Sequence, residues 1–178
     1  MKAFKFFWTT HKWTGIILGV VFVNLAVTGY LLLQKKEHAW LQPPTQQATA
    51  GELKDCISLR QVFDVVLAQN HPDFRTDQDI DRVDFRPSNN VHKVRSKHNH
   101  SEIQVCALTG GVLSVETRTS DWIEQLHDGS FFGDWVHAWI MPIAAMALLF
   151  LVGSGIYIWL APIVSRRRRN KIRSIQGN

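Results

Sequence analysis

The stretch that decides the fold is Trp13–Leu33, WTGIILGVVFVNLAVTGYLLL, which contains no charged residue. A helix of this length spans about 30 Å, the thickness of the hydrocarbon core of a bilayer. A second run, residues 135–163, reads WVHAWIMPIAAMALLFLVGSGIYIWLAPI and is free of charge apart from His137. Tryptophans lie at the ends of both runs, where an aromatic belt is expected. The two runs therefore predict two transmembrane helices.

A cleaved signal peptide is the alternative for the first run. The apolar part of a signal peptide usually has about 7–15 residues and precedes a small-x-small cleavage site. This run is longer and ends in Gln34-Lys35-Lys36-Glu37, without a convincing cleavage signal. We therefore expect a retained helix.

Charge is distributed very unevenly along the chain. All fifteen acidic residues lie between Glu37 and Asp134. In segment 34–134, eleven basic against fifteen acidic residues leave a net charge of −4. At both ends of the chain, all charged residues are basic. This pattern excludes a single soluble globule, a disordered chain and a nucleic-acid-binding protein with charge spread over one face.

The basic run Arg166–Arg169 predicts the orientation, because cytoplasmic segments next to spanning helices are rich in Lys and Arg. Lys35 and Lys36 oppose this orientation weakly. We expect both termini to be cytoplasmic and the middle segment to lie outside the membrane. The predicted division is 1–12 cytoplasmic N-terminus, 13–33 helix, 34–134 external domain, 135–163 helix and 164–178 basic cytoplasmic tail.

The external segment has the pattern of a small α+β domain. Residues 42–51 look like an irregular connector, and Ser58 is a plausible N-cap for the amphipathic helix LRQVFDVVLAQN. Strand-like runs separated by turn residues follow at 81–86, 91–96, 102–108 and 112–117. The fold class is thus a membrane α-helical protein with an inserted α+β domain.

The only two cysteines, Cys56 and Cys106, both fall in the external segment. One flanks the expected helix and the other lies on a central strand. A disulfide between them is therefore reasonable in an oxidising compartment, and two buried free thiols are the alternative.

Three of the eight histidines, His92, His98 and His100, fall on one predicted hairpin. They could hold a transition metal loosely, but a solvated polar strand face is the favoured interpretation.

Three other histidines, His11, His127 and His137, lie at the expected membrane boundaries, where imidazole is costly without a partner or a role. Neutral imidazole is an axial ligand of haem iron. One iron cannot take His11 together with either of the others from the same chain, because about 30 Å of bilayer separates them. Bis-histidine haem would then require a homodimer with four helices. Helix capping, helix–helix contact and binding of lipid headgroups are the simpler alternatives.

Five short motifs occur in a fixed order along the chain: His11-Lys12-Trp13-x-Gly15, Ala26-Val27-Thr28-Gly29, the Ala68–Asp73 run ending in His-Pro-Asp, Leu126-His127-Asp128-Gly129 and Gly153-Ser154-Gly155-Ile156-Tyr157-Ile158-Trp159. Together they resemble the motifs of the PepSY-associated transmembrane proteins of bacterial inner membranes. Larger members have four helices and two PepSY modules, and several are ferric or ferric-siderophore reductases that carry b-type haem. The resemblance implies that this chain forms half of such an arrangement, that residues 34–134 are a periplasmic PepSY-like domain, and that His11 and His127 are the haem ligands. His137 matches no family motif, and it is a candidate through its depth alone.

The resulting expectation is a homodimeric inner-membrane haem b protein that passes electrons outward to ferric iron. A cytoplasmic reductase or quinol would donate the electrons, and the Fe²⁺ formed would supply a ferrous iron transporter. The chain contains no GxGxxG fingerprint for a nicotinamide cofactor. The alternative is a non-enzymatic accessory protein whose external domain binds a partner protein.

Overall fold

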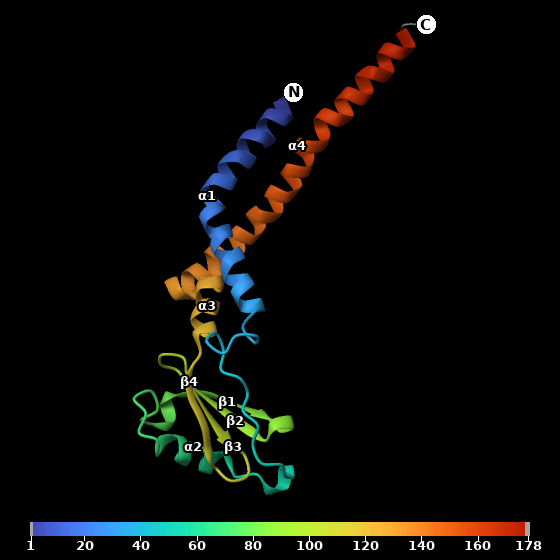
Figure 1. Cartoon of the computed structure of the whole chain (residues 1–178). Helices are drawn as coiled ribbons and strands as arrows, with labels where there is room; N and C mark the ends of the chain where they lie inside the picture. The colour runs from blue at the N-terminus through green and yellow to red at the C-terminus, as the bar shows by residue number, and fades with distance from the viewer. Residues whose placement is uncertain (1, 177–178) are drawn as a thin grey trace. The chain divides into compact units, whose positions relative to one another are not determined.

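A computed structural model describes residues 2–176, with side chains described as far as Asn170 (Figure 1). The chain divides into two compact units. A helical unit contains the residues up to Thr28 and those from Leu126 onward, and a sheet unit contains Gly29–Gln125. Each unit is described by itself below.

Two long helices dominate the helical unit, α1 (Lys2–Leu33) and α4 (Met141–Gln176), and a π-helical turn (Val136–Ile140) precedes α4. Both helices are long and apolar enough to cross a membrane. Only 6% of the most apolar window of α1 and 11% of that of α4 are buried, whereas the core helix of a soluble protein would be mostly buried. The two predicted spanning helices are therefore confirmed by their length, their apolar composition and their low burial. Both helices continue past the predicted spans, α1 back to Lys2 and α4 through the basic tail.

The structure contains one helix that the sequence did not predict, α3 (Thr119–Asp128). A 3₁₀ turn, Ser130–Phe132, follows it. The boundary between the two units falls near the end of α3, after Gln125. Residues 126–134, which were predicted to belong to the external domain, therefore group with the long helices.

The sheet unit contains the short helix α2 (Leu59–Leu67) and a four-stranded antiparallel sheet in the order β1-β2-β3-β4. The strands are β1 (Ile80–Arg86), β2 (Val91–Ser96), β3 (Ser101–Cys106) and β4 (Val112–Thr117). Short 3₁₀ turns lie at Leu53–Asp55, Asp77–Asp79 and Pro87–Asn89. The predicted α+β domain is confirmed, with all four strands close to their expected positions.

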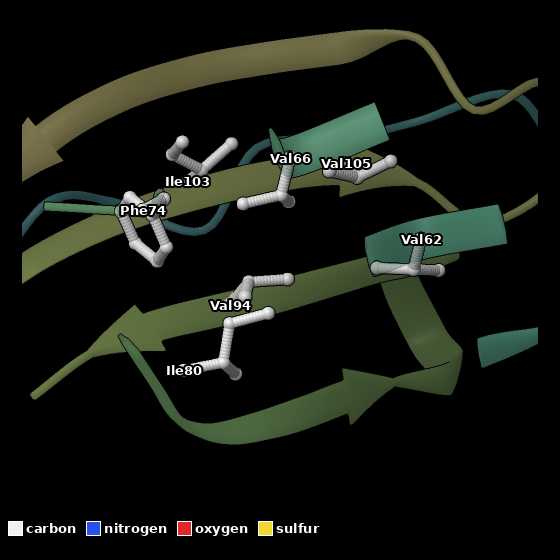
Figure 2. Close-up of a cluster of buried hydrophobic side chains, with 7 residues drawn as sticks. All are labelled: Val62, Val66, Phe74, Ile80, Val94, Ile103 and Val105. Carbon is white, nitrogen blue, oxygen red and sulfur yellow. The ribbon is translucent and has the colours of Figure 1, made fainter. Parts of the chain in front are cut away.

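Helix α2 begins where the sequence predicted. The backbone N–H of Ser58 donates to Gln61 Oε1 (2.8 Å), and Ser58 Oγ accepts from the backbone N–H of Gln61 (3.3 Å), which completes a capping box. The apolar side of α2 covers one face of the sheet, and Figure 2 shows the cluster between them. The members of this core are Val62, Val66, Phe74, Ile80, Val94, Ile103 and Val105.

The other face of the sheet carries charged and polar side chains, yet it is also buried. Lys93 is 2% exposed, and Glu102 and Gln104 are both fully buried. Residues 41–46 run across this face as a strap: Gln104 Nε2 donates to the carbonyl of Pro44 (2.9 Å), and the backbone N–H of Gln46 donates to Gln104 Oε1 (2.9 Å). The segment predicted to be an irregular connector is therefore part of the packing.

Cys56 and Cys106 are both free thiols in this structure, with Cys106 buried and Cys56 partly exposed, and the disulfide between them stays a prediction. Cys106 is buried, and burial alone would raise its pKa. Hydrogen bonds from the Thr109 side chain and from nearby backbone N–H groups outweigh burial and lower the pKa of Cys106 to about 7.

Candidate functional site

His11 on α1 is held by Ser154 on α4, with 2.8 Å between His11 Nδ1 and Ser154 Oγ. The Ser154 hydroxyl donates its single proton to the carbonyl of Leu151 (3.2 Å), so it accepts from His11 Nδ1–H. With the hydroxyl proton placed in this way, the proton of neutral His11 is on Nδ1 and the lone pair is on Nε2. The hydrogen bond fixes the orientation of the ring, and among the described residues no hydrogen bond is made to its Nε2.

The surroundings of His11 leave room on one side of the ring. The imidazole lies close to Gly155 of α4, where an added Cβ would be 3.4 Å from His11 Cε1, in ordinary van der Waals contact. A mostly apolar pocket of about 440 Å³ adjoins the ring, and Trp8, Gly155 and Trp159 contribute to its walls. On the same helix, a Cβ added at Gly15 would lie 3.9 Å from Leu151 Cδ2 of α4, whereas a Cβ added at Gly19 would have no atom within 4 Å.

His127, at the end of α3, repeats the arrangement of His11. Thr28 Oγ1 lies 2.8 Å from His127 Nδ1 and donates to the carbonyl of Asn24 (2.6 Å). Thr28 therefore accepts from His127 Nδ1–H, and Nε2 again carries the free lone pair. A second contact, from Asn24 Nδ2 to the carbonyl of Leu126 (3.0 Å), ties the end of α3 to α1.

His137, on the π-helical turn, has a related but more open environment. Its Nδ1 donates to the carbonyl of Asp128 (2.9 Å) and lies 3.7 Å from Asp128 Oδ2. Its side chain is 57% exposed. Since a carbonyl only accepts, Nδ1 carries the proton here too, and Nε2 is available.

The three candidate histidines fall at two levels of the helical unit. His11 and Thr28, the partner of His127, lie on the same helix about 25 Å apart along its axis. Asp128 is the neighbour of His127 in sequence and the partner of His137, so these two histidines belong to one level. His11 belongs to the other, and one metal ion cannot bind His11 together with either of them from the same chain.

The histidines of the β2–β3 hairpin do not form a metal site. Both nitrogens of His92 are buried without a hydrogen-bond partner, and its ring packs on Phe85 with 4.8 Å between centroids. His98 Nε2 lies 3.1 Å from Asp79 Oδ1. Across the described residues no group of three or more His, Cys, Asp or Glu side chains could hold a metal ion, so the three-histidine hypothesis is wrong.

Sequence reasoning assigned no role to Ser154 and Thr28, the hydroxyls that orient His11 and His127. Both residues are buried: Ser154 is 4% exposed and Thr28 is 5% exposed. The available signal was the presence of a hydroxyl in an otherwise apolar run, because such a group requires a hydrogen-bond partner inside a membrane.

Two long, apolar and mostly uncovered helices, which flank an antiparallel sheet domain in the sequence, define a two-span membrane protein with an inserted α+β domain. The sequence profile of the PepSY-associated TM region matches residues 8–175, and the chain therefore belongs to this family. This confirms the family suggested by the short motifs around His11, His127 and Ser154. Searches of curated proteins and of solved structures gave no match to the chain.

Proposed function

We propose that this protein binds b-type haem in a bacterial inner membrane and transfers electrons outward to ferric iron. The observation that carries the proposal is that His11 and His127 have the same hydrogen-bonding arrangement. In each ring a hydroxyl accepts from Nδ1–H and passes its own proton to a backbone carbonyl, which leaves the Nε2 lone pair free. Iron-ligating histidines have this arrangement, with the second nitrogen fixed by a neighbouring group.

The residues around His11 also suit a flat apolar macrocycle. Trp8, Trp159 and Ile158 offer apolar surface beside the imidazole, and Gly155 also lines this pocket. Bound haem would supply one-electron exchange between Fe³⁺ and Fe²⁺. The protein side chains orient the ligand nitrogens and exclude water.

The need for a homodimer follows from the number of candidate ligands at the level of His11. At the level of His11 the chain supplies one candidate imidazole, so six-coordinate haem there takes its second histidine from another copy. At the other level His127 is the first candidate and His137 the alternative, because Asp128 also directs the free nitrogen of His137. Two haem levels about 25 Å apart along α1 would divide the electron path across the membrane.

Charge distribution supports the direction of transfer. The Arg166–Arg169 run favours cytoplasmic termini and a periplasmic sheet unit. A cytoplasmic reductase or quinol would then reduce the protein, and external Fe³⁺ would take up one electron to give Fe²⁺. A ferrous iron transporter would use this product.

The experiment is electron transfer across a reconstituted membrane. Full-length protein is incorporated into vesicles that contain trapped dithionite, and ferric citrate with the Fe²⁺ indicator ferrozine is added outside. We expect indicator colour from wild-type vesicles and from His98→Ala, and none above protein-free vesicles from His11→Ala. Equal rates with and without protein would contradict the proposal and favour an accessory role in which the sheet unit binds a partner protein.

A further inference from the structure

The sheet unit contains a cationic pocket on the face covered by the strap. Its volume is about 370 Å³, and Pro43 and Pro44 of the strap form part of its wall. Four of its lining residues are basic and no lining residue is acidic; the basic residues are Lys36, Arg86, Lys93 and Arg95. They come from three separate segments, namely the chain just after α1, the end of β1, and β2.

The fold gathers more positive charge here than it neutralises. Glu102 is shared by three cations, at 3.3 Å from Lys93 Nζ, 2.9 Å from Arg118 Nη1 and 3.6 Å from Arg95 Nε. Asp84 adds one contact to Arg95, at 3.3 Å.

Two of the four lining cations, Lys36 and Arg86, have no carboxylate within ion-pair distance among the described residues. Arg95 Nε is buried and has no hydrogen-bond partner. The pocket therefore retains both net positive charge and an unused N–H donor.

The positive charge of this pocket contrasts with the negative net charge of the segment that contains it. Residues 34–134 carry fifteen acidic against eleven basic side chains. Bringing four cations together costs free energy through mutual repulsion, and an anion bound among them would remove that cost. Partial burial strengthens each interaction, because the charges there are screened less by water and salt.

We propose that this pocket binds an oxyanion group, a carboxylate or a phosphate, with Arg86 and Lys36 as the exposed contacts and Arg95 and Lys93 behind them. The planar guanidinium groups of the two arginines match the geometry of such an anion. The group belongs either to a soluble anion or to the headgroup of an anionic lipid. A lipid is within reach, because Lys36 lies three residues beyond the end of α1 at Leu33, at most about 10 Å of chain.

The test uses full-length protein in a non-ionic detergent and does not depend on haem. Citrate is titrated by calorimetry, and phosphatidylglycerol and phosphatidylcholine are compared by native mass spectrometry. Arg86→Gln removes one exposed pocket cation. Arg60→Gln is the matched control, because Arg60 is also exposed but lies on α2, which covers the opposite face of the sheet.

We expect saturable binding of citrate or selective retention of phosphatidylglycerol, weakened about tenfold or more by Arg86→Gln and changed less than about twofold by Arg60→Gln. Citrate binding with this dependence assigns a soluble anion, and phosphatidylglycerol binding alone assigns a lipid headgroup. The proposal is overturned if neither probe binds saturably, or if the two variants weaken binding equally.

Discussion

The helical unit and the sheet unit hold their polar groups in opposite ways. In the helical unit, His11 and His127 are each fixed by a hydroxyl that passes its proton to a backbone carbonyl. In the sheet unit, the buried polar groups are full charges, and Glu102 serves several cations at once. The groups left without a partner therefore differ. In the helical unit they are lone pairs on imidazole nitrogens, and in the sheet unit they are positive charges.

The difference follows from the surroundings of each unit. Placing a charged side chain inside a bilayer costs several kcal/mol of free energy. Neutral hydrogen bonds position a histidine there without that cost. A domain in water can bury an ion network, provided that each charge has a partner. Bonding capacity left unused in either setting indicates where a ligand would bind.

The largest expected effect is on haem binding by the helical unit. His127→Ala removes a proposed iron ligand, and we expect the haem bound at that level to be lost. Thr28→Val keeps the ligand but removes the hydroxyl that orients it, and we expect about 10-fold weaker haem affinity. Haem content per chain is measured on purified protein by the pyridine haemochrome assay.

His71→Ala is the control for these variants, because His71 lies in the sheet unit. It should leave the haem content unchanged. Haem content equal to wild type in both His11→Ala and His127→Ala would contradict the ligand assignment and remove the contrast between the two units.

A smaller effect is expected from breaking the ion network of the sheet unit. Glu102→Gln leaves Lys93 and Arg118 buried without their shared carboxylate, and we expect a loss of about 3–5 kcal/mol in the free energy of unfolding of this unit. Hydrogen exchange of β2 and β3 amides in the full-length protein, followed by mass spectrometry, measures it.

Glu116→Gln provides the matched control, because Glu116 lies opposite Glu102 on β4 but is exposed. Its effect should remain within about 0.5 kcal/mol. Similar losses in the two variants would show that the buried network does not stabilise the unit.

The smallest effect concerns His92 and depends on pH. Burial lowers the pKa of His92 in the folded unit, so below about pH 6.5 the unfolded chain binds a proton first and stability falls as pH decreases. His92→Phe removes this proton and two buried nitrogens without partners, and we expect about 1 kcal/mol of added stability.

The measurement is hydrogen exchange of β2 at pH 7.5 and pH 5.5. The gain from His92→Phe should be larger at the lower pH. An identical gain at both values would indicate that His92 does not take part in the acid sensitivity of the unit.

The parts of the fold predictable from sequence are those with a local pattern. Charge-free runs predicted α1 and α4, and the alternation of apolar residues predicted four strands. Helix α3 has no such pattern, since its sequence TSDWIEQLHD is mostly polar and its position depends on distant contacts such as Asn24 with Leu126. The strap has no periodicity either, and its place depends on Gln104.

The candidate site was predictable to a similar extent. Depth in the membrane and short motifs singled out His11, His127 and His137, but not the hydroxyls that orient two of them. Those pairs join residues far apart in sequence, so no spacing rule reveals them. The cationic pocket was hidden for the same reason: the sequence placed Lys93 on a strand, but not under a strap beside Arg86 and Lys36.

The most direct test of the central claim is an oxidised-minus-dithionite-reduced visible spectrum of the detergent-purified wild-type protein, produced in cells with ample haem. Free imidazole nitrogens held at defined positions, each paired with a nitrogen from a second copy of the chain, predict the sharp α and Soret bands of six-coordinate b-type haem. A flat spectrum would contradict the claim, and the oriented histidines would then have to be explained as contacts between helices.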